Sequence, residues 1–258
     1  MAWSILLGIL FVAGTVGLTL AAYTLMRCLA LAAGDFGTKE LAGSVASGVS
    51  ALHGLILALV FAQEMIDYQQ LRYENTVEAN AVADIYYDIE RYDPAGARPV
   101  QDMLYSYVKA VTDEEWDRLG ATGRLSPGAW VRWDEAYNAI LNLSPGNDRQ
   151  RSLRDNMLAR VHAVAETRVE RENHAGASVS MLFWFAAVAG VVCIALAYYS
   201  YPPKRVNLWL VSLYGAFTGL VLFFIYAFEN PYSAPGRMAP DAHIRLIEQL
   251  DRARGASG

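Results

Sequence analysis

Residues 41–62 read LAGSVASGVSALHGLILALVFA, a run without a charged side chain. A bilayer core about 30 Å thick is crossed by ~20 helical residues, so this run is long enough to span a membrane. Three further runs of similar length are also free of charge, and they cover about residues 3–26, 179–200 and 206–228. Because a spanning segment must satisfy its backbone groups internally, the sequence predicts four transmembrane helices.

The composition agrees with a membrane protein. Charged residues make up 18% of the 258 residues, whereas a soluble globular chain carries roughly a quarter. The net charge of −5 argues against binding to nucleic acid. The two cysteines, Cys28 and Cys193, lie in or beside apolar runs. They are too few to form a disulfide framework or a metal quartet.

The polar part of the chain is one insertion, residues 63–178, and it reads as helices throughout. No Gly or Pro occurs between Gly54 and Pro94, so the second span is expected to continue out of the membrane as one helix. Ser126 before Pro127 is a typical helix start. Thr112 and Glu115 form a capping-box pattern, which predicts another helix start.

These patterns predict an all-α membrane protein with a helical extramembrane domain inserted between spans two and three. The domain core is expected from apolar residues at helical spacing and from tryptophans: Val100, Leu104, Tyr107, Val111, Trp116, Trp130, Trp133, Met157, Val161 and Val164. We divide the chain into a first hairpin (1–62), the helical domain (63–178), a second hairpin (179–228) and a C-terminal tail (229–258).

No pattern in the sequence indicates an enzyme. The four histidines are far apart: His53, His162, His174 and His243. Glu74 and Glu78, and also Asp84 and Asp88, lie one helical turn apart, and on a long helix we expect such pairs to face solvent. We therefore expect no catalytic residue, no cofactor and no metal site.

The second span carries two patterns. Small residues at 3–4 spacing allow close helix packing, and they are Gly43, Ser47 and Gly54. An adjoining face carries Ser50, His53, Leu57, Val60, Glu64 and Asp67. If several copies of this helix surround an axis, that face lines a pore. Its polar residues face water, its apolar pair forms a dry constriction, and its carboxylates attract cations at one mouth.

Two alternatives stay open. The same face of the second span also fits packing against the other three spans. The chain also fits a non-conducting membrane module that binds a protein partner or senses a ligand through its helical domain. In that case Trp116, Trp130 and Trp133 matter more for function than His53.

Three short motifs resemble a known family. They are TVEANA at residues 76–81, YVKAVTDEEW at 107–116, and ENPYS at 229–233 followed by Pro240. They are similar to motifs of bacterial four-span membrane proteins described as bestrophin-like, whose function is unknown. The family tail usually reads Pro-Phe-x-Gly, and here Ala234 stands in place of the glycine. The resemblance extends over nearly the whole chain.

The resemblance implies a homo-oligomer, commonly a pentamer, in a bacterial inner membrane. It implies a pore lined by the second span, with an apolar neck that Leu57, Val60 and Phe61 match, and inorganic ions as partners alongside the lipid bilayer. It also implies a cytoplasmic helical domain. The short loops between spans hold four Lys and Arg residues, which favours the opposite orientation, with the loops in the cytoplasm and the helical domain outside. We expect the helical domain to be cytoplasmic.

Overall fold

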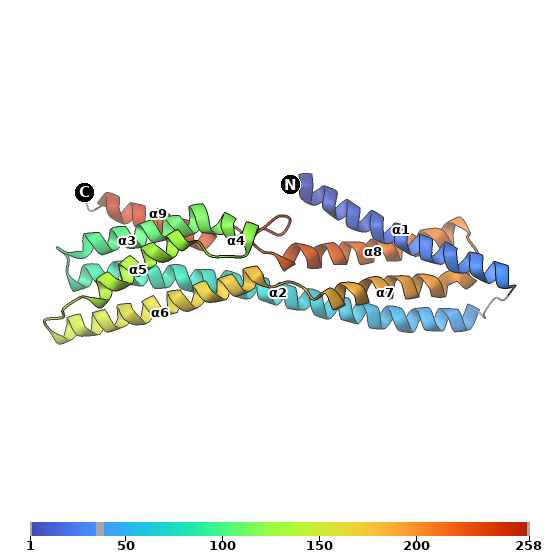
Figure 1. Cartoon of the computed structure of the whole chain (residues 1–258), viewed down its shortest axis with the longest axis horizontal. Coiled ribbons are helices and arrows are strands. Elements are labelled where there is room, and N and C mark those ends of the chain that lie inside the picture. Colours follow the sequence, from blue (N-terminus) through green and yellow to red (C-terminus); the bar gives the residue numbers. More distant parts are fainter. Residues whose placement is uncertain (1, 35–38, 257–258) are drawn as a thin grey trace. The chain divides into compact units, whose positions relative to one another are not determined.

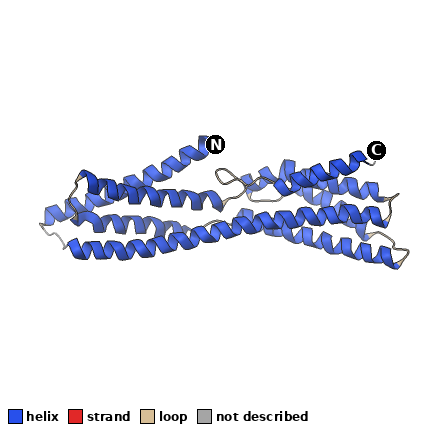
Figure 2. Cartoon of the chain, turned by 180° about the vertical axis from the view of Figure 1, so that it is seen from behind, coloured by secondary structure: helices blue, strands red, loops and turns tan. Residues whose placement is uncertain are grey.

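A computed structural model describes residues 2–34 and 39–256, and these residues form helices and loops without a strand (Figure 2). The predicted all-α class is confirmed. Besides a π-helical turn η1 (Val111–Glu115) and a 3₁₀ turn η2 (Tyr198–Ser200), the helices are α1 (Ala2–Ala33), α2 (Lys39–Tyr92), α3 (Ala97–Ala110), α4 (Trp116–Thr122), α5 (Pro127–Leu141), α6 (Asp148–Gly176), α7 (Met181–Ala197), α8 (Arg205–Glu229) and α9 (Asp241–Ala256).

The chain divides into two units. Unit 1 comprises Met1–Ile66 and Ser178–Glu229, and unit 2 comprises Asp67–Ala177 and Asn230–Gly258. Helix α2 runs through the boundary without a break, as the absence of Gly and Pro predicted. The segment after Glu229, which the sequence suggested as a separate tail, is counted with unit 2. There α9 lies alongside α3 (Figure 1) and buries Leu246 and Leu250 in the core.

Four helices are long and apolar enough to cross a membrane, and their bounds are Ala2–Ala33, Lys39–Tyr92, Met181–Ser200 and Arg205–Glu229. The prediction of four spans is confirmed. Large apolar side chains on these helices point outward, among them Phe185 on α7 and Phe217 on α8, which are 74% and 66% exposed. Such surfaces suit the hydrocarbon core of a bilayer.

Helices α1 and α8 approach each other through small residues. Gly215 and Gly219 on α8 face Thr15 and Thr19 on α1. Each threonine hydroxyl donates to a carbonyl of its own helix, with Thr19 Oγ1 2.6 Å from the oxygen of Thr15. Both hydroxyls therefore have a partner in their own helix, and the two backbones lie close together, as is common for small residues in membrane helices.

The core of unit 2 follows the predicted faces. The inward residues of α3 and α6 are buried, as are Trp116 and Trp133, while Trp130 is partly buried. The Ser126 start is confirmed, because its side chain accepts from the backbone N–H of Ala129 at 3.4 Å. The start predicted at Thr112 is wrong. Its hydroxyl donates to the carbonyls of Val108 and Lys109, and the chain continues through η1 into α4 without a new cap.

Candidate functional site

One face of α2 is buried inside unit 1. Ala46, His53 and Leu57 are at most 5% exposed. The His53 imidazole lies between two helices, with Nε2 3.0 Å from the carbonyl oxygen of Ala187 on α7. Its Nδ1 lies 3.0 Å from the hydroxyl of Tyr214 on α8. Both ring nitrogens therefore have hydrogen-bond partners.

A glycine makes room for the histidine. A Cβ placed on Gly190 would lie 2.8 Å from Cγ of the His53 ring, which is closer than packed carbon atoms approach. The ring therefore fits against α7 only because position 190 lacks a side chain. Leu57, one turn further along α2, packs with Ala187, Leu222 and Ile225.

These contacts fit the alternative in which this face of α2 packs against the other spans, and the pore-lining role of His53 and Leu57 stays a prediction. His53 and Leu57 contact α7 and α8 of the same chain instead of facing outward. Ser50, Val60, Glu64 and Asp67 are partly exposed, and their pore-lining role stays a prediction.

The small residues of α2 fall into two groups, one packed within unit 1 and one exposed. Gly43 lies against the Tyr201 hydroxyl, which a Cβ would approach to 2.8 Å, so this glycine packs within unit 1. Ser47 and Gly54 are exposed, and nothing lies within 4 Å of a Cβ placed on Gly54. If these two residues pack against a helix, that helix belongs to another molecule, and their helix-packing role stays a prediction.

The opposite face of α2 is apolar and uncovered. Leu52, Leu55 and Leu59 are 65%, 56% and 63% exposed, and open space surrounds Gly48. Residues 48, 52, 55 and 59 follow helical spacing, so they form one stripe, which we call the leucine face. No helix of the described chain buries it, so lipid or further copies of the protein have to cover it.

Unit 2 contains a buried ionic cluster that the sequence analysis missed. Glu78, Glu115, Arg168 and Arg171 are at most 1% exposed. Glu115 accepts from Arg168 at 2.8 Å and from Arg171 at 2.9 Å, while Arg171 also pairs with Glu78. The Tyr107 hydroxyl donates to Glu78 at 2.5 Å. The prediction that the carboxylate pairs of α2 face solvent is wrong for Glu78 and for Asp88, which is 6% exposed.

Burial shifts the pKa values of this cluster. It raises the pKa of Glu115, although the Arg168 charge opposes the shift, and it raises the pKa of Tyr107 to about 12. Burial lowers the pKa of Arg171 to about 10, so Arg171 is still charged at neutral pH. Two carboxylates face two guanidinium groups, which is the arrangement that buried charges require, and the cluster joins α2, η1 and α6.

His243 on α9 is fully buried beside this cluster. Its Nε2 lies 3.1 Å from Oε1 of Glu78, its ring packs near Trp116, and its Nδ1 has no partner in the described structure. Burial lowers the pKa of His243 well below its usual value, and the nearby charges of Arg171 and Arg168 lower it further. The imidazole is therefore neutral in the folded protein at neutral pH.

Unit 2 is expected to lose stability as the pH falls below about 6.5. An unfolded histidine takes up a proton near pH 6.5, whereas folded His243 does not, so the unfolded state binds more protons and the free energy of unfolding decreases. The loss is up to about 1.4 kcal/mol per pH unit. The raised pKa of Glu115 acts in the opposite direction, because the folded state then takes up the proton first.

The effect of His243 is isolated by comparing the native chain with His243→Gln. Thermal unfolding is recorded by tryptophan fluorescence between pH 7.5 and 5. The amide of Gln is able to donate to Glu78 and does not titrate, so the difference in stability between the two proteins should narrow as the pH falls. A constant difference across this range would contradict the assignment.

The fold matches known proteins along almost its whole length. The model of the Bestrophin-like domain matches residues 9–242. The chain belongs to the bestrophin-like family. Two crystal structures of single-substitution variants of a bacterial bestrophin homolog from Klebsiella pneumoniae have TM-scores of 0.69 and 0.68 and are 14% and 12% identical to this chain. The match covers 94% of this chain in both cases, and 97% and 98% of theirs. No curated protein matches the sequence.

This family and the four apolar helices make the chain an integral membrane protein of bestrophin-like fold. The resemblance read from the motifs is thereby confirmed. At such low identity, the solved structures show a shared fold and carry no residue roles into this chain.

Proposed function

We propose that the protein is a homo-oligomeric ion channel whose pathway is lined by α2. The observation that carries this proposal is the leucine face, an apolar stripe with an open glycine on a membrane-spanning helix that its own chain leaves uncovered. Family membership supports the proposal. Copies of the chain arranged around an axis, a pentamer in the family pattern, turn this face toward the axis and away from lipid.

The leucine face supplies the constriction in this proposal. Leu52, Leu55 and Leu59 are exposed on the side of α2 opposite His53 and Leu57, and we place the constriction there instead of at Leu57 and Val60. A ring of leucine side chains forms an apolar constriction, which excludes water and closes the pathway by dewetting. His53 acts behind the pathway, where its contacts with α7 and α8 hold the orientation of α2.

Acidic residues near the end of the second span favour the passage of cations over anions. Glu64 and Asp67 are partly exposed on α2 beyond the leucine face, and Glu64 lies on the side of the helix that carries His53 and Leu57. In this proposal they meet the pathway only at its mouth, where, repeated in each copy, they form carboxylate rings that attract cations. In this proposal the protein lies in the bacterial inner membrane, with its helical domain in the cytoplasm. Inorganic ions pass through the channel, and no cofactor is needed.

Glu64→Gln is expected to lower the preference for cations. The full chain is reconstituted in planar bilayers under a KCl gradient, and the reversal potential is measured. The native protein should show unitary currents that reverse toward the K⁺ equilibrium potential, and the variant should reverse several millivolts closer to zero, because one negative charge per copy is lost. Glu90→Gln, an exposed carboxylate later on α2, is the matched control and should leave the reversal potential unchanged.

Silent bilayers from a folded native oligomer would overturn the proposal. They would favour the non-conducting interaction module instead. An equal shift in both variants would instead assign the selectivity to general surface charge and remove Glu64 from the pathway.

A further inference from the structure

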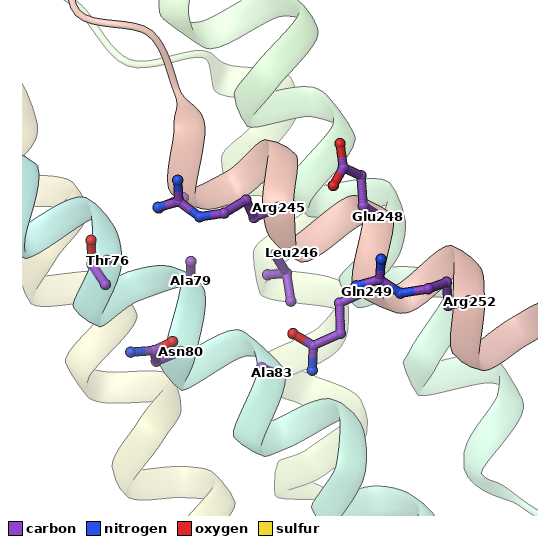
Figure 3. A pocket seen from close by; sticks show the side chains of 10 residues that line it. Thr76, Ala79, Asn80, Ala83, Arg245, Leu246, Glu248, Gln249 and Arg252 are labelled. Atoms are coloured by element: carbon purple, nitrogen blue, oxygen red, sulfur yellow. The ribbon is translucent and has the colours of Figure 1, made fainter.

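Unit 2 contains a hollow of about 340 Å³ between α2 and α9 (Figure 3). Alanines make the space, because Ala79 and Ala83 on α2 and Ala242 on α9 leave room that longer side chains would fill. The polar side chains around it are Thr76, Asn80, Arg245, Glu248, Gln249 and Arg252. Pockets for small molecules begin at roughly this volume.

Two arginines of the hollow have no ion-pair partner in the described part of the chain. Arg245 and Arg252 are exposed, whereas Arg254 on the same helix pairs with Asp102. In Figure 3 the two guanidinium groups lie on either side of Gln249, and the Glu248 carboxylate points away from α2. Positive charge is therefore available in the hollow.

The positive charge continues past Arg245. A smaller adjoining hollow of about 40 Å³ shares Thr76, Ala242 and Arg245 with the first and adds Arg72 from α2. The side chain of Arg72 also has no ion-pair partner in the described residues. The carboxylates of Glu248 and Asp241 also line the two hollows, but in the described residues no ion pair joins them to the three arginines. The groove therefore carries an excess of positive charge in a chain whose net charge is −5.

The spacing of the arginines sets the length of a ligand. Arg245 and Arg252 are seven residues apart, which is about 10 Å along a helix that rises 1.5 Å per residue. Guanidinium groups bind carboxylates and phosphates through two parallel hydrogen bonds. Between the arginines stand the amides of Asn80 and Gln249, and the Gln249 amide is held by its hydrogen bond to the Tyr87 hydroxyl at 2.9 Å.

We propose that this groove binds a small polyhydroxylated molecule with an acidic group, phosphate or carboxylate, at each end. Arg245 and Arg252 bind the two acidic groups. Asn80 and Gln249 donate to and accept from the hydroxyl groups between them. Thr76, whose hydroxyl donates to the carbonyl of Arg72, accepts from them, and the alanines provide a flat floor. This site is independent of ion conduction, so the two proposals stand or fall separately.

Binding is measured by titration calorimetry on the full chain in detergent. The probes are fructose 1,6-bisphosphate for two phosphates and glucarate for two carboxylates, with fructose as the neutral control. At least one of the two acidic probes should bind saturably, and the tighter one identifies the acidic group. Arg245→Gln and Arg252→Gln should each weaken that binding about tenfold or more, the usual effect of losing a charge-assisted bond. Arg149→Gln, an exposed arginine on α6 outside the groove, should leave it unchanged.

A second variant tests the hollow without changing its charge. Ala83→Leu places a larger side chain in the space between the arginines and should abolish binding while the thermal unfolding temperature stays near that of the native chain. The proposal is overturned if neither acidic probe binds at millimolar concentration, or if Arg149→Gln weakens binding as much as the groove variants do. It is also overturned if the arginine variants change the size of the oligomer without changing binding, since the groove is then an interface between copies.

Discussion

Arg171→Met is expected to lower the unfolding temperature of unit 2 by roughly 10 °C or more. Arg171 is 1% exposed, and its side chain contacts Glu78, Glu115 and the amide oxygen of Asn75. Methionine has a similar volume but leaves Glu78 without its guanidinium partner. Breaking a buried ion pair on one side costs about 3–5 kcal/mol, and each kcal/mol shifts the midpoint of a domain of this size by about 2–4 °C. Tryptophan fluorescence reports the transition, because Trp116 and Trp133 are buried in unit 2.

The matched control is Arg151→Met. Arg151 also forms an ion pair, with Asp148 at 2.8 Å, but both side chains are exposed, so the loss should stay below about 1 kcal/mol. Adding Glu78→Leu to Arg171→Met removes the unpaired charge and should recover part of the stability. Equal midpoints for the two single variants would show that the buried cluster does not stabilise unit 2.

Gly219→Leu is expected to separate α1 from α8. A Cβ on Gly219 would lie 2.8 Å from the carbonyl oxygen of Phe11 and 2.9 Å from the Cα of Val12. Both atoms belong to the backbone of α1, so no side-chain rotation relieves the clash and the helices have to move apart. Overpacking costs about 1–3 kcal/mol and occasionally more. The fraction of protein that elutes as a folded species after extraction from the membrane should therefore fall several-fold.

Gly14→Leu is the control for this substitution. Gly14 lies on α1, and nothing lies within 4 Å of a Cβ at that position, so leucine should be tolerated there. Size-exclusion chromatography in detergent compares the two variants. Similar folded yields would mean that α1 and α8 do not require a close approach at Gly219.

The fold could be predicted from the sequence because its signals are local. A charge-free run of about 20 residues has few alternatives to a membrane helix, and the order of spans and domain follows from where those runs lie. The Ser126 cap depends on the residues beside it. The start predicted at Thr112 was wrong because the same hydroxyl is able to bond the carbonyls of the preceding turn.

The site was harder to predict because its decisive contacts join distant segments. Polar residues at 3–4 spacing on α2 suit a pore and a packed face equally well. The choice depends on Gly190, which makes room for the His53 ring on another helix. A signal for the ionic cluster was present in α6, where Arg168 and Arg171 continue the spacing of the buried Met157, Val161 and Val164. Arginines in an apolar stripe indicate buried partners.

The position of α2 in the assembled protein tests the central claim most directly. A density map of the full chain in lipid nanodiscs decides it. We expect a closed ring of copies in which Leu52, Leu55 and Leu59 of every α2 point toward a common axis that holds no lipid. Single chains, or a ring in which the leucine face points outward to lipid and α1 or α8 surrounds the axis, would contradict the account.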